Sequence, residues 1–193
     1  MLIRSPHAGF TLVELLITVA IAGVLLSLAF PSFRAWMQNA KIRTAAEGIQ
    51  NGLQLARIEA VRRNARVSWV NNNGAWSVGC VAAAVVLDTD GDGVDECPAV
   101  IQSRSADELG STPPTIVTQD INGNIGVTTV TFNGLGRVVA NDDATASITR
   151  IDVDAAAGTI SDAESRDMRI LIGSGGQIRS CDSFFAPPDS RAC

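Results

Sequence analysis

The chain has 193 residues, of which 46% are apolar, and its formal net charge is −5. That length suits one domain with an appendage, and the apolar fraction is sufficient for a hydrophobic core, which excludes wholesale disorder. The only histidine is His7, so the body of the protein has no His-based catalytic triad and no multi-His metal site. The sequence also has no Gly-x-Ser-x-Gly elbow and no phosphate-binding loop, so we expect a protein that is not an enzyme.

Charge is distributed unevenly along the chain. Residues 1–33 contain one basic and one acidic residue, whereas residues 34–66 hold seven basic against two acidic residues, a balance of +5. Residues 67–193 hold seven arginines against 17 acidic residues, a balance of −10. The chain therefore has an apolar start, a basic middle and an acidic body, and the net negative charge is unfavourable for nucleic-acid binding by the whole protein.

The N-terminus contains an apolar run with a charge at its start. Residues 15–33 are uncharged and mostly aliphatic, which is about the length that crosses a bilayer core as a helix. The short basic leader ends at Gly9, before the run, and no Ala-x-Ala site follows the run, so the pattern differs from a secretory signal. A carboxylate inside hydrocarbon costs several kcal/mol unless it is neutralised, so Glu14 either has a function there or marks the membrane interface.

The sequence GFTLVELL at residues 9–16 resembles the N-terminal signature of type IV pilins and pseudopilins. In that family a prepilin peptidase removes the leader and methylates the new N-terminal residue. The resemblance implies that residues 1–9 are a leader, that cleavage falls between Gly9 and Phe10, and that Phe10 is N-methylated. It implies that Glu14 meets the terminal amine of a neighbouring subunit, so that two costly charges neutralise each other on assembly. Pro31 lies where many pilins have a helix-kinking proline.

The resemblance also implies a location and partners. It places the chain in the cell inner membrane as a single-pass protein with a periplasmic C-terminal domain, and afterwards in a pilus or pseudopilus fibre. The implied partners are the prepilin peptidase, other major and minor pilins, and the inner-membrane assembly platform.

A helical pattern continues beyond Pro31 to about Ala65. We expect a transmembrane and assembly half at residues 10–33 and an amphipathic half at residues 34–66, roughly 84 Å from Phe10 to Ala65. Gly48 and Gly52 weaken this helix locally. One apolar stripe with spacings of three and four residues predicts the face that packs on a globular domain: Ile42, Ala46, Ile49, Leu53, Ala56 and Ala60.

Arginines gather near the end of the predicted helix. One interpretation is a solvated helix C-terminus, where cations suit the helix dipole. The other is a contact surface for acidic partner subunits or anionic groups. The cluster consists of Arg57, Arg62, Arg63 and Arg66.

Residues 67–193 consist of short apolar or alternating runs separated by turn residues. No helical periodicity of useful length follows residue 66, so we expect a mostly antiparallel sheet domain. The fold class is therefore α+β, a long N-terminal helix packed on a C-terminal domain of antiparallel β-sheets. The predicted strands are 67–70, 76–87, 99–103, 116–118, 127–132, 137–139, 148–153, 168–172 and 177–180.

All four cysteines lie in the body, and three pairings are open. Disulfides are expected because an exported domain meets an oxidising compartment. We favour Cys80–Cys97, which closes an acidic loop, and Cys181–Cys193, which ties down the C-terminal tail, each contributing about 2–4 kcal/mol. A zinc site is the alternative, but the paired close spacings of zinc sites are missing.

The acidic loop at residues 88–96 resembles the start of an EF-hand. Asp88, Asp90 and Asp92 occupy positions 1, 3 and 5 of such a loop, but position 12 is Ala99 instead of a bidentate Glu. The two interpretations are a Ca²⁺ site at these aspartates and a polar hairpin loop built from Asp-Gly turns. We expect no other cofactor.

Three segments of the body, residues 64–67, 131–137 and 173–181, resemble the GspH/FimT group of minor pilins and pseudopilins. That group implies two antiparallel sheets packed against the long helix. The leading hypothesis is a minor type IV pilin that takes part in pilus assembly and priming at the inner membrane. The close rival is the equivalent H-type minor pseudopilin of a type II secretion system.

Some pilus members of this group bind DNA through a C-terminal Gly-Arg-x-Arg element. The corresponding residues 176–179 read Gly-Gln-Ile-Arg here, so Gln177 replaces the first arginine. A DNA-binding minor pilin in DNA uptake is thus the third functional candidate. Its anion or DNA patch, for which a mixed-charge surface is the alternative, would consist of Arg166, Arg169, Arg179 and Arg191.

Overall fold

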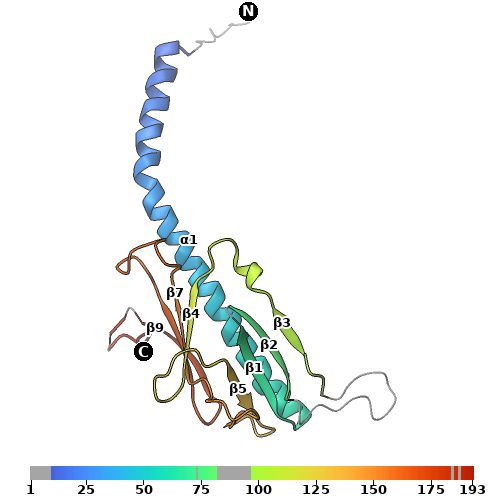
Figure 1. Ribbon diagram of the computed structural model, residues 1–193. Helices are drawn as coiled ribbons and strands as arrows, with labels where there is room; N and C mark the ends of the chain where they lie inside the picture. The colour runs from blue at the N-terminus through green and yellow to red at the C-terminus, as the bar shows by residue number, and fades with distance from the viewer. Residues whose placement is uncertain (1–9, 73, 82–96, 184, 187) are drawn as a thin grey trace, which may run out of the picture.

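A computed structural model describes residues 10–72, 74–81, 97–183, 185–186 and 188–193 of the chain. Its dominant element is the helix α1, Leu12–Arg63, whose first half projects from a β-rich body (Figure 1). Thr11 caps the start, since its side-chain oxygen accepts a hydrogen bond from the backbone N–H of Glu14 at 3.2 Å. Asn64 ends the helix in the left-handed conformation at φ 48°. These bounds lie within two residues of the expected ones.

α1 is bent between its two halves. The segments Leu12–Ser27 and Ser32–Arg63 meet at an angle of 43°. Pro31 lies in the interval between them, at the place where a kink was expected, because a proline lacks the backbone N–H that the helix hydrogen bond needs. Side chains at residues 28, 29 and 31 are outside the described part of the chain.

The second half of α1 packs on the body through the predicted stripe. Each of its six residues is at most 2% exposed: Ile42, Ala46, Ile49, Leu53, Ala56 and Ala60. Burial of each large aliphatic side chain stabilises the fold by about 1.5–3 kcal/mol, so this face fixes the helix to the sheets. The stripe predicted from its spacing is therefore the face through which the helix packs on the body.

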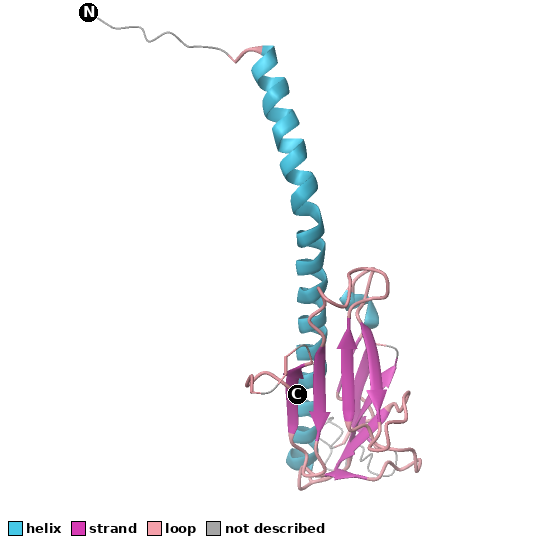
Figure 2. Ribbon diagram, turned by 90° about the vertical axis from the view of Figure 1, so that its left-hand side faces the viewer, coloured by secondary structure: helices cyan, strands magenta, loops and turns pink. Residues whose placement is uncertain are grey.

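The body consists of two antiparallel sheets that flank the lower half of α1 (Figures 1 and 2). In the five-stranded sheet the strands follow the order β3-β2-β1-β5-β6, and in the four-stranded sheet the order is β4-β7-β8-β9. The first sheet comprises β1 (Val67–Asn72), β2 (Ala75–Cys80), β3 (Gln102–Arg104), β5 (Thr129–Phe132) and β6 (Val138–Val139). The second comprises β4 (Thr115–Gln119), β7 (Arg150–Asp154), β8 (Met168–Ile172) and β9 (Ile178–Asp182). A short 3-10 helix, η2 (Ala106–Leu109), interrupts the described β body, and the expected α+β class is confirmed.

The strands differ from the prediction around the first disulfide. β2 ends at Cys80 instead of continuing to residue 87, and residues 82–87 lie outside the described part. The following run pairs regularly with β2 only from Gln102, not from residue 99. The carbonyl of Ala99 lies against the backbone of Gly79, 1.8 Å from where a Cβ would be. Backbone bonds from Cys80 N–H to the carbonyl of Pro98 and from Ile101 N–H to the carbonyl of Val78 still tie this segment to β2.

Two hairpin turns of the same kind meet beside the end of α1. Residues 133–137 and 173–177 each form a tight turn in which the fourth residue, a glycine, has positive φ: 70° at Gly136 and 81° at Gly176. The carbonyl oxygen of Gly136 lies 1.9 Å from the position of a Cβ on Gly176 and accepts a hydrogen bond from Nε of Arg57 at 3.2 Å. The turns therefore join α1 to both sheets.

The two helix glycines expected to weaken α1 are points of close approach. A Cβ on Gly52 would lie 2.8 Å from Nε1 of Trp69 and 3.0 Å from the ring of Trp76, two buried side chains. A Cβ on Gly48 would collide with the guanidinium of Arg104. The lost helix propensity is thus offset by the burial of two large aromatic rings against the helix.

Candidate functional site

The start of α1 presents the residues that the pilin resemblance singled out. Phe10 is 85% exposed, and Glu14 lies in the first turn of the helix, also exposed. The described large apolar side chains from Phe10 to Phe33 are 54–85% exposed. A helix that is apolar on all sides is normally buried by lipid or by other protein segments. The β body of this chain does not bury those described side chains.

Among the residues that the structure describes, no single helix is long and apolar enough to count as a membrane span. The two segments of α1 on either side of the bend pass the same test when they are taken together.

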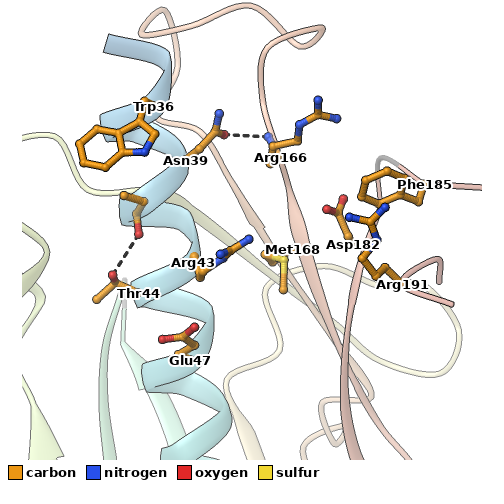
Figure 3. Close-up of a pocket in the computed structure, with 11 residues that line it drawn as sticks. Trp36, Asn39, Arg43, Thr44, Glu47, Arg166, Met168, Asp182, Phe185 and Arg191 are labelled. Carbon is orange, nitrogen blue, oxygen red and sulfur yellow. Dashed lines mark hydrogen bonds between the residues drawn. The ribbon is translucent and has the colours of Figure 1, made fainter. Parts of the chain in front are cut away.

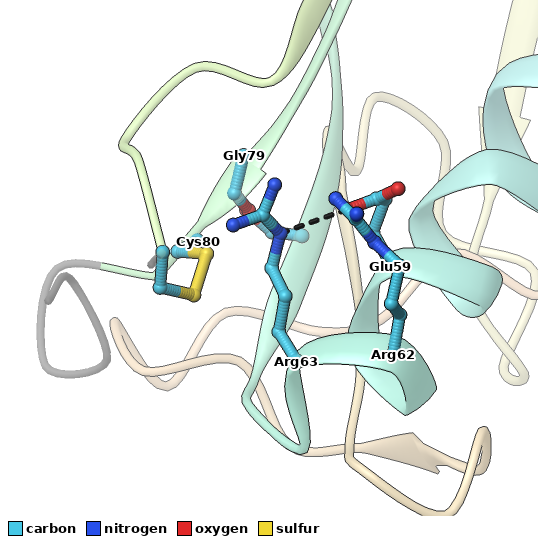
Figure 4. Close-up of a disulfide and its surroundings, with 7 residues drawn as sticks. Glu59, Arg62, Arg63, Gly79 and Cys80 are labelled. Carbon is cyan, nitrogen blue, oxygen red and sulfur yellow. Dashed lines mark hydrogen bonds and ion pairs between the residues drawn. A yellow bond between two sulfur atoms is a disulfide. The ribbon is translucent and has the colours of Figure 1, made fainter. Parts of the chain in front are cut away.

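The basic cluster at the end of α1 is paired within the chain (Figure 4). Arg62 and Arg63 hold the carboxylate of Glu59 at 2.7 and 2.8 Å. Partial burial raises the pKa of Glu59, but hydrogen bonds and charge from the two arginines outweigh it and leave the pKa below its ordinary value. Arg66 pairs with Asp142 and donates to the carbonyl of Ala140. Arg57, through its bond to Gly136, and Arg66 therefore tie the end of the helix to the β body, whereas Arg62 and Arg63 pair with Glu59 within α1.

The four arginines of the proposed DNA patch do not share one face. Arg169 is paired with Asp152 at 2.7 Å, and strand register places Arg169 and Arg179 on the same face of the four-stranded sheet. Met168, adjacent to Arg169 in β8, points to the opposite face and lines a cavity together with Arg166 and Arg191. The structure therefore separates the four into two pairs, Arg169 with Arg179 on one face of the sheet and Arg166 with Arg191 at the cavity.

We call that cavity the α1–β9 groove (Figure 3). It has a volume of about 580 Å³. From α1 it is lined by Trp36, Asn39, Arg43 and Glu47, among others. From the sheet and the C-terminal tail it is lined by Arg166, Met168, Asp182, Phe185 and Arg191.

Contacts fix the walls of the groove. The backbone N–H of Arg166 donates to Oδ1 of Asn39 at 2.8 Å, which ties the loop before β8 to the helix. The guanidinium of Arg191 lies 3.7 Å from the ring centroid of Phe185 and is held by Asp189 through Nε and Nη2 at 3.1 and 2.9 Å. These bonds hold the pKa of Asp189 at about 2.

Sequence reasoning missed the groove as a site. On α1 its members are spaced by three or four residues, at Trp36, Asn39, Arg43 and Glu47, a pattern that marks one helix face. The partners across the groove lie more than 100 residues later, so only the fold shows that they are neighbours.

Both predicted disulfides are present. Cys80–Cys97 joins the end of β2 to the return of the acidic loop, and Cys181–Cys193 joins β9 to the C-terminus. Asp88, Asp90 and Asp92, the proposed Ca²⁺ ligands, lie outside the described residues. Elsewhere, within the described part of the chain, no three His, Cys, Asp or Glu side chains are grouped as a metal site requires.

The arrangement defines a class of protein. A helix with an exposed apolar half and a buried amphipathic half, fixed to a small antiparallel β domain, belongs to a structural subunit built to pack through its helix. The family profile of the type II transport protein GspH matches residues 45–176, and that of the prokaryotic N-terminal methylation motif matches residues 4–30. The chain belongs to the GspH family, and so to the minor pilins and pseudopilins.

Comparison with solved structures found two crystal forms of the type IV minor pilin FimU from Pseudomonas aeruginosa strain PAO1. The first is 19% identical with a TM-score of 0.48 and covers 79% of this chain and 97% of that one. The second is 20% identical with a TM-score of 0.44 and covers 76% and 97%. Comparison with curated protein sequences gave no match.

Proposed function

We propose that the chain is a minor type IV pilin that takes part in assembly and priming of the fibre at the inner membrane. The supporting observation is the division of α1: its second half is covered by the chain's own sheets, whereas its described first half offers exposed apolar side chains. In the membrane, lipid covers that half, and in the fibre, neighbouring helices cover it.

Glu14 and the mature amine of Phe10 act in this scheme as complementary charges. Prepilin peptidase removes residues 1–9, and methylation leaves the new terminal amine basic. Glu14 of one subunit then pairs with the amine of another as the helix leaves the membrane, so that neither charge stays unpaired in an apolar environment. Other pilins and the inner-membrane assembly platform are the partners, and the β domain lies in the periplasm until assembly.

Incorporation of a Glu14→Ala variant into fibres tests this proposal. We expect normal peptidase processing and normal membrane fractionation, but at least tenfold less of the variant in sheared, purified fibres. Asp162→Ala, which removes an exposed carboxylate from a loop of the β domain, serves as the control and enters fibres normally. Wild-type levels of Glu14→Ala in fibres would refute the role of Glu14, and a retained leader on fibre-derived protein would refute the processing.

A pseudopilin role in type II secretion is the second candidate, favoured by the family profile that matches residues 45–176. Deletion of the gene separates the two. Loss of surface pili with unchanged protein secretion supports the pilus, whereas loss of secretion with unchanged pili supports the secretion system.

A further inference from the structure

We propose that Trp36 anchors α1 at the periplasmic membrane–water interface and thereby sets the height of the β body above the bilayer. The partner is the lipid surface itself, with the indole ring at the level of the ester and phosphate groups. The inference rests on the membrane anchoring in the proposed function. It gives a role to an exposed side chain that pairing of Glu14 with a terminal amine does not involve.

Two features of the chain bound the headgroup layer along α1. On the membrane side, Arg34 is the first charged residue after the uncharged run of residues 15–33, so the hydrocarbon core ends before its guanidinium group. On the other side, the side chain of Asn39 donates to the carbonyl of Glu164 at 2.9 Å, a contact with the β body, which the proposed function places in the periplasm. From residue 34 to residue 39 the helix rises about 7–8 Å, close to the thickness of a headgroup layer, about 5–7 Å. Trp36 lies inside this interval.

The indole of Trp36 leans towards the membrane. Side chains of an α-helix tilt towards its N-terminus, which is the membrane end of α1. The ring centroids of Trp36 and Phe33 lie 5.8 Å apart, so the indole is next to the last residue of the apolar run. Trp36 is 65% exposed and Phe33 is 54% exposed, so the β body leaves most of both side chains uncovered. The indole therefore lies where the apolar surface of α1 ends.

A tryptophan at this place resists movement of the helix in either direction. Its ring has a large apolar surface, whereas its one N–H group needs a hydrogen-bond acceptor. Deeper in the hydrocarbon the N–H group loses its acceptors, and farther out the ring is exposed to water; the headgroup layer satisfies both. This preference does not depend on the charge of the lipid, so the mixed charges of the α1–β9 groove do not bear on it. The depth of Trp36 in turn fixes the β body just outside the headgroups, since the contact of Asn39 with that body is only three residues farther along α1.

Depth-dependent fluorescence quenching of the full chain in phosphatidylcholine vesicles tests the assignment. The vesicles contain lipids with a nitroxide either near the carbonyl end or near the methyl end of the acyl chain. Trp69 and Trp76 are buried in the β body, and the variant Trp36→Phe, which keeps an aromatic ring beside Phe33, measures their share of the signal. After subtraction of that share, we expect the shallow nitroxide to quench Trp36 at least twofold more strongly than the deep one. Phosphatidylglycerol mixed into the vesicles leaves this ratio unchanged.

The matched control moves the tryptophan along the same helix. Trp36→Phe/Gln54→Trp places an indole at an exposed position beside the β body, about 27 Å farther from the membrane. We expect neither nitroxide to quench it above the share of Trp69 and Trp76, while aqueous acrylamide quenches it readily. Lipid quenching of this variant as strong as that of Trp36 would overturn the assignment, because it would show that contact with lipid does not depend on the level of the residue.

Bilayer thickness tests whether Trp36 sets the depth of the helix. In vesicles of short, medium and long acyl chains, we expect the emission maximum of Trp36 and its shallow quenching to stay constant, because the helix tilts to keep the indole at the interface. An emission maximum that moves steadily with thickness would overturn the anchoring role, since the indole would then be carried passively by the helix.

Three further results would also overturn the proposal. Stronger quenching by the deep nitroxide would place Trp36 in the hydrocarbon, and quenching that requires phosphatidylglycerol would show a response to charge instead of to the interface. Absence of quenching by either nitroxide, in vesicles with which the chain floats, would place Trp36 in water or under a neighbouring subunit. A chain that does not float with the vesicles refutes membrane anchoring itself, and thus the proposed function, which distinguishes that failure from a failure of Trp36 alone.

Discussion

Substitution of Gly176 by alanine tests the contact between the two hairpin turns. The residue has φ 81°, where a non-glycine residue costs about 1–2 kcal/mol. A Cβ would also lie 1.9 Å from the carbonyl oxygen of Gly136, which accepts the hydrogen bond from Arg57. Relief of that overlap requires the turns to separate and weakens a bond to a charged donor, a further cost of about 1.5–3 kcal/mol. We expect a total loss of about 4 kcal/mol in the free energy of unfolding.

Gly158→Ala is the matched control. Gly158 has φ 73°, but a Cβ there would have no heavy atom within 4 Å, so only the backbone cost of about 1.5 kcal/mol applies. Thermal unfolding of the full chain in detergent, followed by near-ultraviolet circular dichroism with the disulfides intact, measures both variants. At about 2–4 °C per kcal/mol we expect Tm to fall by about 8–16 °C for Gly176→Ala and about 3–6 °C for Gly158→Ala. Equal shifts would show that the turns do not join the sheets as described.

Three further changes probe other contacts. Serine in place of both Cys181 and Cys193 leaves the core folded but frees the tail, so we expect a loss of about 3 kcal/mol and rapid trimming from the C-terminus in limited proteolysis, detected by mass spectrometry. Gly52→Ala pushes a methyl group against Trp69, and we expect a net destabilisation of about 1–2 kcal/mol in denaturant titration despite better helix propensity; a stabilised variant would contradict the close packing. Arg191 lowers the pKa of Asp189 to about 2, so the stabilisation that the ionised carboxylate of Asp189 contributes is complete above its ordinary pKa of 3.8 and is lost only as pH falls through about 2. Carbon NMR titration of the carboxyl measures this pKa, and we expect Arg191→Gln to return it towards 3.8.

Local patterns predicted most of the elements. The six-residue stripe on α1 is buried as its spacing required, because helical periodicity alone decides which side chains share a face. Strand positions followed from alternation and turn residues, and both disulfides agreed with the favoured pairing. The strand ending at Cys80 was predicted too long, because an apolar run does not show where a neighbouring segment stops pairing.

Long-range placement was beyond the sequence. Gly52 reads as a weak helix position, and only the approach of Trp69 explains it. Arg66 was grouped with a cluster at the helix end, but it pairs with Asp142 and donates to the carbonyl of Ala140, 74 residues later. In the same way, the four arginines proposed as one patch divide into two pairs: strand register places Arg169 and Arg179 on one face of the sheet, whereas Arg166 and Arg191 lie in a loop and in the C-terminal tail beside the groove.

The sequence by itself determined that this protein has a long N-terminal helix with an apolar first half, followed by a β-rich domain that holds all four cysteines, because length, hydropathy and periodicity are local properties of a chain. Only the tertiary structure decided which surfaces exist. Trp36 and Arg43 on α1 meet Arg166 and Phe185 in one groove because α1 lies alongside the β8–β9 hairpin and the C-terminal tail, across more than 100 intervening residues. No local pattern encodes that meeting, since it depends on the packing of the whole core.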